Sequence, residues 1–481
     1  MKLLHIALKN YKHLKQIDLT VSEGRGLQEF PAFFCIGLNG SGKSAFLEAL
    51  ALIFSRISQD ELPGFWFEVE YEIFVDDRNV RVAVKPEAER RLGRLAVTID
   101  GERYHSFVGR EDYLPRKVVV CVPGFNSQMK QFLGETARKS IISDIYDAQR
   151  ENPDQIENCL QHLSQLNRNP RMLYLDEEMA PYVLFALCAW NSRREDDYDG
   201  LREKLFHRAD ENLSPTALSL AEGKRIEGAL LRQLFEELSD WVAEGEEYRT
   251  AAYDLKQSGS VCHPKIREAY ENPLQLLTLL LQARESGELG ECHVFFKRGE
   301  RSGIFNEKAL SDGELLWMAR MGMVLTASQG ETDNCLFLFD EPDVHWNETW
   351  NVEFVRTLEC MTWREMRRNH CFWIATHSSL LLTDALPDQV FLFEREAEDV
   401  RARRVPISLF AGSRQEISRN VFRNDAQIGE FADRRVKEMM REEDPGSLEK
   451  YIEQVGAGIW RFKLLEKYST CSVERSKEHS T

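Results

Sequence analysis

The feature that most constrains the fold is a glycine-rich segment, Gly37–Ser44 (GLNGSGKS). It follows the apolar run FPAFFCIG and precedes the helical pattern AFLEALALIFSRI. A strand, a glycine loop and a helix in this order let backbone N–H groups turn inward around the phosphates of a nucleotide. Lys43 would add a positive charge at the β and γ phosphates, and the Ser44 hydroxyl would bind Mg²⁺. A glycine turn arising by chance is the alternative, and the flanking strand and helix disfavour it.

Polar residues end two later apolar runs. Asp340 and Glu341 close the run LFLF, and His377 follows the run CFWIAT. Sites in open α/β sheets form at the carboxyl ends of strands. We therefore expect Asp340 to support the metal, Glu341 to activate a water as general base, and His377 to contact the γ-phosphate. The alternatives are a solvated turn for the two carboxylates and a core or capping role for the histidine.

A fourth pattern, LSDGE, opens the helical stretch LLWMARMGMVL. Ser311 and Gly313 at a helix N-terminus present a hydroxyl, backbone N–H groups and the positive end of a helix dipole, which together favour an anion. Because Gly37–Ser44 already serves the phosphates within one chain, we expect the nucleotide of a partner subunit to use this second site. A simple N-cap is the alternative.

Composition limits the partners. The 481 residues carry 62 Lys and Arg against 79 Asp and Glu, a net charge of −17, so polyanion binding, if present, must be regional. The ten cysteines form no CxxC pair, and Cys262-His263 and Cys292-His293 lack zinc-ligand spacing, which predicts packing residues in a reducing compartment. No signal peptide and no apolar run of about 18 residues is present, so we expect a cytoplasmic location without a membrane.

The chain pattern predicts an α/β protein. Short strands are expected over 3–9 and 17–21, an antiparallel sheet from Phe65 to Val122, and helices from Gly124 to about Arg284. Helices return past about Pro406, with one final helix over 448–468 and a disordered tail in the last ten residues.

The order of these four motifs resembles the ATP-binding-cassette class of P-loop ATPases, specifically its soluble SMC/RecF-like branch, whose N-terminal opening also resembles Leu8–Lys12 (LKNYK). In that class two heads sandwich two ATP molecules, so the resemblance implies a homodimer or higher oligomer, with ATP and Mg²⁺ as cofactors. It implies catalytic roles for Lys43, Glu341 and His377. The implied metal ligands are Ser44, Asp340 and Gln128. The implied nucleotide-binding residues are Asn39, Gly40, Ser41, Gly42, Lys43, Ser44, Ala45, Ser311 and Gly313.

The same resemblance implies an ABC-ATPase head, with a mixed sheet and an antiparallel β lobe, that is split by an inserted helical subdomain. The N-terminal half of the head would span 1–135, the helical insertion 136–289, and the C-terminal half of the head, with signature, Walker B and His switch, 290–408. A helical C-terminal region and tail would span 409–481.

A narrower likeness is to the compact ATPases of prokaryotic restriction and anti-phage defence systems, such as the Septu-type ATPase subunit. It rests on Arg171–Glu177, Val344–Trp346, Ile428–Glu430 and Val455–Ala457. The likeness implies that the ATPase controls a separate effector, a nuclease. The chain has no carboxylate set of the two-metal TOPRIM kind and no HNH-like histidine cluster, so cleavage is expected of a partner.

Asp312 departs from the family pattern, where transporters carry glycine, and no zinc hook or hinge is present. Two other functions stay open. One is a RecF-like DNA-repair ATPase that clamps duplex DNA, motivated by the basic runs Arg364–Arg368 and Arg401–Arg404. The other is a nucleotide-binding assembly scaffold with little turnover.

Overall fold

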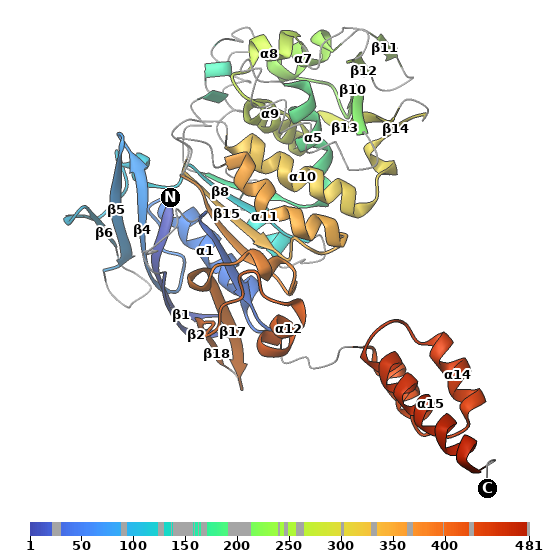
Figure 1. Ribbon diagram of the computed structural model, residues 1–481. Helices are drawn as coiled ribbons and strands as arrows, with labels where there is room; N and C mark the ends of the chain where they lie inside the picture. Colours follow the sequence, from blue (N-terminus) through green and yellow to red (C-terminus); the bar gives the residue numbers. More distant parts are fainter. Residues whose placement is uncertain are drawn as a thin grey trace. The chain divides into compact units, whose positions relative to one another are not determined.

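The computed structural model describes most of the chain, which divides into two compact units, residues 1–413 and residues 414–481 (Figure 1). The described residues are 1–21, 30–87, 94–123, 129–135, 137, 157, 159–161, 163–164, 171–190, 213–238, 241–244, 249–255, 264–299, 303–328, 334–362, 369–397, 399–422 and 428–478.

The first unit is built on a seven-stranded sheet in the order β18-β17-β3-β16-β15-β8-β9. All neighbours run parallel except β17 and β18. Strands β3, β8, β9, β15 and β16 are buried along their whole length, as expected when both faces of a parallel sheet are covered. The strands are β3 Ala32–Ile36, β8 Lys117–Cys121, β9 Arg171–Leu175, β15 Cys335–Asp340, β16 Cys371–Ala375, β17 Val390–Glu396 and β18 Asp399–Arg404.

A second sheet is antiparallel and has six strands in the order β2-β1-β4-β5-β6-β7. Helix α1 (Lys43–Ile57) is buried along nearly its whole length, and one apolar cluster joins it to both sheets. The mixed sheet with its glycine loop and the antiparallel lobe confirm the expected α/β fold class. The strands are β1 Lys2–Tyr11, β2 Leu14–Thr20, β4 Trp66–Val75, β5 Arg78–Pro86, β6 Leu95–Ile99 and β7 Glu102–Tyr104.

Strand β8 corrects one expectation. The sequence pattern assigned KVVVCV to the antiparallel sheet, whereas β8 lies between β15 and β9 in the parallel sheet. The run is continuous in apolar residues instead of alternating, which is the pattern of a strand covered on both faces.

The stretch between Gly124 and Arg284 contains helices, as expected, and also strands that the pattern did not predict. Strand β9 joins the parallel sheet, and β10, β11 and β12 form a five-stranded antiparallel sheet with β13 and β14 in the order β11-β12-β10-β13-β14. Pairing partners, more than local propensity, stabilise β10, whose sequence LSPTALSLAE is poor in β-branched residues. The strands are β10 Leu213–Glu222, β11 Trp241–Glu244, β12 Arg249–Asp254, β13 Leu289–Arg298 and β14 Ile304–Asn306.

Helices of the first unit pack on these sheets (Figure 1). Helix α5 contacts α9, α10 and β13, so it joins the third sheet to the region of the parallel sheet. Within the described ranges, no helix combines the length and apolar character that crossing a membrane requires. The helices are α5 Ala180–Ala189, α7 Ala229–Glu237, α8 Pro264–Ala269, α9 Pro273–Ser286, α10 Asp312–Ala327 and α11 Glu348–Thr362.

The second unit is helical. The single final helix expected over 448–468 is instead two helices, α14 and α15, which are separated at Val455–Gly458, where Gly458 has φ 154°. Helix α15 also continues through most of the stretch expected to be a disordered tail. The helices are α12 Arg414–Phe422, α13 Glu430–Met439, α14 Pro445–Gln454 and α15 Ile459–Glu478.

Candidate functional site

Three strand ends meet at one edge of the parallel sheet. Asp340 of β15 pairs with Ala375 of β16, and Ala375 pairs with Cys35 of β3. Because the strands are parallel and in register, the segments that follow them lie side by side. The register thus brings the loop Gly37–Ser44 next to Asp340, Glu341 and His377, although these residues are far apart in the sequence.

The glycine loop is closely packed at Gly37 and open at Gly40. Gly37 has φ 143°, and a Cβ added there would overlap the carbonyl oxygen of Phe393. Gly40 has φ 76°, and an added Cβ would meet nothing within 4 Å. Asn39 is exposed, whereas Ser41 is buried and its hydroxyl has no hydrogen-bond partner among the described residues. An unpartnered buried hydroxyl beside open space suits a ligand that brings its own acceptors.

The Lys43 side chain is buried against the backbone of the glycine loop. The side chain is only 4% exposed, and its Nζ donates to the carbonyl oxygens of Gly37 at 3.1 Å and Leu38 at 3.3 Å. Burial lowers the pKa of Lys43, while the carboxylates of Glu341 and Asp340 act in the opposite direction. The two carbonyl groups carry no net charge, so they offset the charge of a buried ammonium less well than the oxygens of a phosphate would.

Ser44 and Asp340 form the pair that could hold a divalent cation. The Ser44 hydroxyl donates to Asp340 Oδ1 at 2.8 Å, and Asp340 is buried. Mg²⁺ is usually bound by one or two carboxylates together with phosphate oxygens and water, so two protein ligands fit it. Among the described residues there is no cluster of three or more His, Cys, Asp or Glu side chains that could hold a metal without such help. Gln128, the third expected ligand, lies outside the described residues.

Glu341 leaves the strand in a left-handed conformation, with φ 45°. Its backbone N–H donates to the Ala375 carbonyl oxygen at 2.8 Å, which fixes the residue against β16. Its Oε1 lies 3.4 Å from His377 Nε2. A hydrogen bond from His377 keeps the pKa of Glu341 below its ordinary value, although burial acts the other way. The carboxylate is therefore ionised near neutral pH and able to accept a proton.

His377 faces two partners with one nitrogen. Its Nε2 lies 2.7 Å from Lys43 Nζ as well as 3.4 Å from the Glu341 carboxylate. A ring nitrogen without a proton accepts from the ammonium, and a protonated one donates to the carboxylate, so the two contacts belong to different protonation states. The contact with Lys43 is the shorter of the two.

Asp343 and Thr376 connect the segments that follow β15 and β16. Thr376 Oγ1 donates to Asp343 Oδ1 at 2.7 Å, and the N–H of Ser378 donates to Thr376 Oγ1 at 2.9 Å. Burial raises the pKa of Asp343. Neither residue was predicted to have a role, although both lie within the segments DEPD and ATHS that also carry Glu341 and His377.

Two residues of the opening run Leu8–Lys12 contact the helix that begins at the glycine loop. The Tyr11 hydroxyl and the Lys12 ammonium donate to the two carboxylate oxygens of Glu48 at 2.7 and 2.5 Å. Because Glu48 lies on α1, these contacts tie the hairpin of β1 and β2 to the helix that begins at the glycine loop.

The segment around Ser311 is a capped helix start. Ser311 is exposed, and both its backbone N–H and its hydroxyl donate to Glu314 Oε2 at 2.8 Å. Gly313 is buried, and a Cβ added there would overlap the carbonyl oxygen of His345. Further along α10, buried Arg320 donates to the Pro342 carbonyl oxygen at 2.6 Å. Helix α10 is thereby attached to the turn that follows Glu341.

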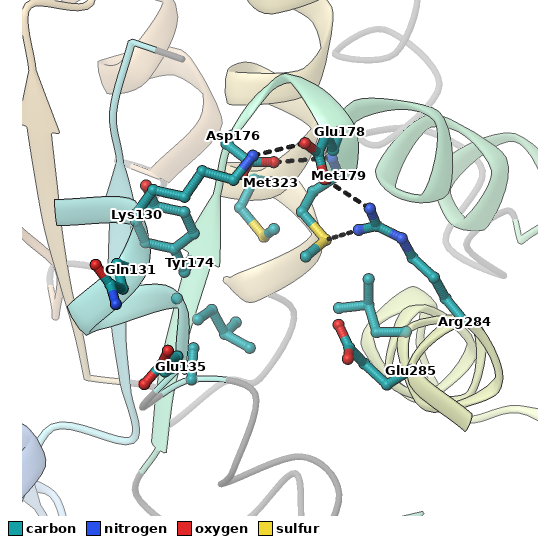
Figure 2. Close-up of a pocket in the computed structure, with 14 residues that line it drawn as sticks. Lys130, Gln131, Glu135, Tyr174, Asp176, Glu178, Met179, Arg284, Glu285 and Met323 are labelled. Carbon is teal, nitrogen blue, oxygen red and sulfur yellow. Dashed lines mark hydrogen bonds and ion pairs between the residues drawn. The ribbon is translucent and has the colours of Figure 1, made fainter. Parts of the chain in front are cut away.

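A separate cavity of about 250 Å³ opens near the end of β9 (Figure 2). Lys130 bridges Asp176 at 3.1 Å and Glu178 at 2.6 Å, and Arg284 donates to Glu178 at 2.8 Å. None of the expected site residues that the structure describes lines it, so it is separate from the glycine loop. The lining residues are Lys130, Gln131, Gly134, Glu135, Ala137, Leu173, Tyr174, Asp176, Glu178, Met179, Leu281, Arg284, Glu285 and Met323.

The basic run Arg401–Arg404 lies on β18, where each arginine has a carboxylate partner. Arg401 pairs with Glu396 at 3.2 Å. Arg403 and Arg404 pair at 3.0 Å with Glu394 and Asp388, respectively. The other basic run, 364–368, lies outside the described residues.

No protein-family model and no curated protein sequence matches the chain. Among solved structures, the chain is similar to the Smc head domain from Pyrococcus furiosus in complex with the C-terminal domain of ScpA, at 15% identity over 85% of this chain and 96% of that one, with a TM-score of 0.36. It is also similar to the recombination mediator protein RecF with ATP, at 13% identity over 84% of this chain and 99% of RecF, again with a TM-score of 0.36.

Proposed function

We propose that the protein is a Mg²⁺-dependent ATPase. The observation that carries this proposal is the meeting of Lys43, Ser44, Asp340, Glu341 and His377 at one edge of the parallel sheet. A phosphate-binding loop, a metal-binding pair and an ionised carboxylate within reach of each other are what phosphoryl transfer to water requires.

Each residue of the site would have a separate role in hydrolysis. The N–H groups of the glycine loop would surround the phosphates, and Lys43 would exchange its two carbonyl acceptors for phosphate oxygens. Ser44 and Asp340 would hold Mg²⁺, which neutralises charge on the phosphates when bound. Glu341 would take the proton of the attacking water, and His377, once Lys43 turns to phosphate, would be free to donate a hydrogen bond.

We infer further that two copies of the chain close around ATP. The exposure of Ser311 at the start of α10 supports this, because its side chain is open to a second molecule. In this arrangement Ser311 and Gly313 would complete the nucleotide site of the partner copy. Gly313 also has a packing role within its own chain, against His345.

The finer proposal is that this ATPase controls a separate nuclease in an anti-phage defence system. It rests on the resemblance of the secondary motifs to Septu-type ATPases. The alternative of a DNA clamp is weakened on β18, where Arg401, Arg403 and Arg404 already pair with carboxylates. Copurification of the chain with the product of a neighbouring nuclease gene would support the defence role.

The test of the ATPase proposal is the variant Glu341→Gln. Hydrolysis should fall by about 100- to 10,000-fold, because the amide cannot accept the proton of water, while ATP still binds. Glu353→Gln is the matched control, since Glu353 is an exposed glutamate on α11. Phosphate release and binding of a fluorescent ATP analogue measure the two effects. Equal turnover in Glu341→Gln and wild type would refute the general-base assignment, and absence of turnover in wild type would favour the scaffold.

A further inference from the structure

Strand β13 contacts the chain on both sides of Ser311. It pairs with β14, where Phe296 faces Phe305. The chain then passes through a short helical turn, η4 (Glu307–Ala309), to Ser311 and α10. The segment 307–314 therefore follows directly from an edge strand of the third sheet.

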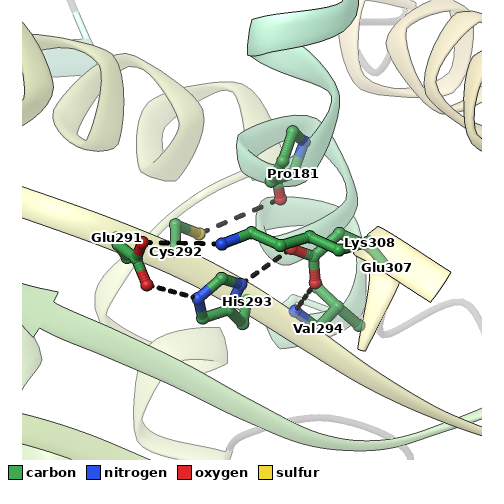
Figure 3. A network of polar contacts seen from close by, with 7 residues as sticks. All are labelled: Pro181, Glu291, Cys292, His293, Val294, Glu307 and Lys308. Carbon is green, nitrogen blue, oxygen red and sulfur yellow. Dashed lines mark hydrogen bonds and ion pairs between the residues drawn. The ribbon is translucent and has the colours of Figure 1, made fainter. Parts of the chain in front are cut away.

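The first contact lies before Ser311 (Figure 3). His293 Nδ1 is 2.7 Å from Glu307 Oε1, and the Val294 N–H donates to Glu307 Oε2 at 2.9 Å. The Glu307 side chain is only 1% exposed. A buried carboxylate is costly unless it is fully hydrogen-bonded, and here both of its oxygens are held by β13.

The other side of the imidazole also faces a carboxylate. His293 Nε2 lies 2.9 Å from Glu291 Oε2, and Lys308 approaches Glu291 Oε1 at 3.5 Å. A neutral imidazole has one donor, so only the imidazolium satisfies Glu307 and Glu291 together. In agreement, the hydrogen bond to Glu307 raises the pKa of His293, with support from Glu291, while burial and Lys308 oppose it. Ser219, the residue opposite His293 on β10, carries no charge.

The second contact lies after Ser311. Arg298 Nη2 donates to Glu314 Oε1 at 2.8 Å, and the other oxygen of Glu314 holds the N–H and hydroxyl of Ser311. An uncompensated carboxylate beside Ser311 would repel a phosphate. The Arg298 guanidinium offsets this charge and fixes the carboxylate by a charge-assisted hydrogen bond.

We propose that β13 positions the Ser311 segment for the nucleotide of a second copy, with doubly protonated His293 and Arg298 as its two positioning residues. The proposal rests on the proposed function, since it is there that Ser311 meets a nucleotide. The pKa of His293 in the folded chain lies above its ordinary value of about 6.5. The stabilisation is therefore complete below that ordinary value and is lost as the pH rises through the pKa of His293 in the fold.

Hydrogen exchange of the full chain without nucleotide tests the positioning directly. At about pH 6, His293→Gln should speed exchange of the amides in 307–316 by about 10- to 100-fold, because a charged hydrogen bond is worth that much, and the excess should shrink as the pH rises. His105→Gln is the matched control, since His105 also pairs with a glutamate, Glu87 at 3.0 Å, but on the exposed surface. Arg298→Gln should have the same local effect, and Arg298→Lys should restore part of the protection.

Two results of the exchange experiment would overturn the proposal. One is exchange in 307–316 that equals wild type in both His293→Gln and Arg298→Gln. The other is faster exchange spread evenly over residues 1–413, which would mean general support of the fold.

ATP hydrolysis separates this proposal from the proposed function. If wild type hydrolyses ATP and His293→Gln keeps both the rate and its pH profile, β13 does not position Ser311 for catalysis, and the ATPase assignment stands. If wild type does not hydrolyse ATP but the exchange changes are local, the ATPase assignment fails and the positioning of 307–314 stands.

Discussion

Helices α1 and α10 both begin at segments that were predicted to bind anions, but their N-terminal caps differ. Helix α1 has Gly42 as its N-cap, with no side-chain cap and no acidic residue in its first turn. Helix α10 has Ser311 as its N-cap, a complete capping box, and Asp312 and Glu314 in its first turn. The N–H groups of α1 are left for an external anion, whereas the chain itself supplies the negative charge at α10. Similar helix starts thus differ in what they can bind alone.

The largest expected difference between the two helix starts concerns nucleotide binding. Lys43→Met should abolish stabilisation by Mg²⁺ and a non-hydrolysable ATP analogue, which amounts to about 2.7 kcal/mol at a ligand concentration 100-fold above Kd. Ser311→Ala should keep this stabilisation in the monomer, because its partner would be a second copy. Thermal unfolding with and without the analogue measures both. Lys85→Met, which alters an exposed lysine, is the control. Equal losses in Lys43→Met and Ser311→Ala would contradict the comparison.

A smaller effect should separate the glycines of the two segments. Gly37→Ala and Gly313→Ala should each lower the free energy of unfolding by about 2–3 kcal/mol, because the added Cβ overlaps a backbone carbonyl. Gly40→Ala should cost only about 1 kcal/mol, the price of a left-handed conformation in open space. Urea denaturation of the three variants measures the order. If Gly40→Ala lowered the free energy of unfolding as much as Gly37→Ala, the space beside Gly40 would not be open.

The smallest effect should come from the capping box. Glu314→Ala should destabilise the first unit by about 1 kcal/mol, since Ser311 loses the acceptor of its N–H and hydroxyl. Asp312→Ala, in the same turn but outside the capping box, should change stability less. Chemical denaturation compares the two, and a reversed order would show that dipole charge matters more than the cap.

The glycine loop and the polar strand ends could be predicted because each signal is local. A glycine loop between an apolar strand and a helix has one common use, and a carboxylate after a buried strand can be read without a partner. The contact between Lys43 and His377 could be anticipated only through the shared sheet edge. Residues such as Thr376 and Asp343 were missed because a hydrogen bond between two loops leaves no pattern in the sequence.

The sheet assignments were less predictable because pairing is non-local. Nothing in KVVVCV says which neighbours β8 takes, and β10 becomes a strand through β12 and β13. The break between α14 and α15 had a local signal, Gly456 and Gly458, but the apolar pattern on either side continued and hid it. Strand partners and helix breaks therefore needed the tertiary structure.

The order of strands in the parallel sheet has a consequence for synthesis. Strand β3, which leads into the glycine loop, pairs with β16 and β17, and these strands come near the end of the first unit. At a translation rate of about 5–20 residues per second, β3 waits tens of seconds on the ribosome before either neighbour exists. The nascent chain must therefore protect an apolar strand with two open edges until late in synthesis. For the same reason, an N-terminal fragment that ends before Cys371 would carry the glycine-loop sequence without the two strands that pair with β3.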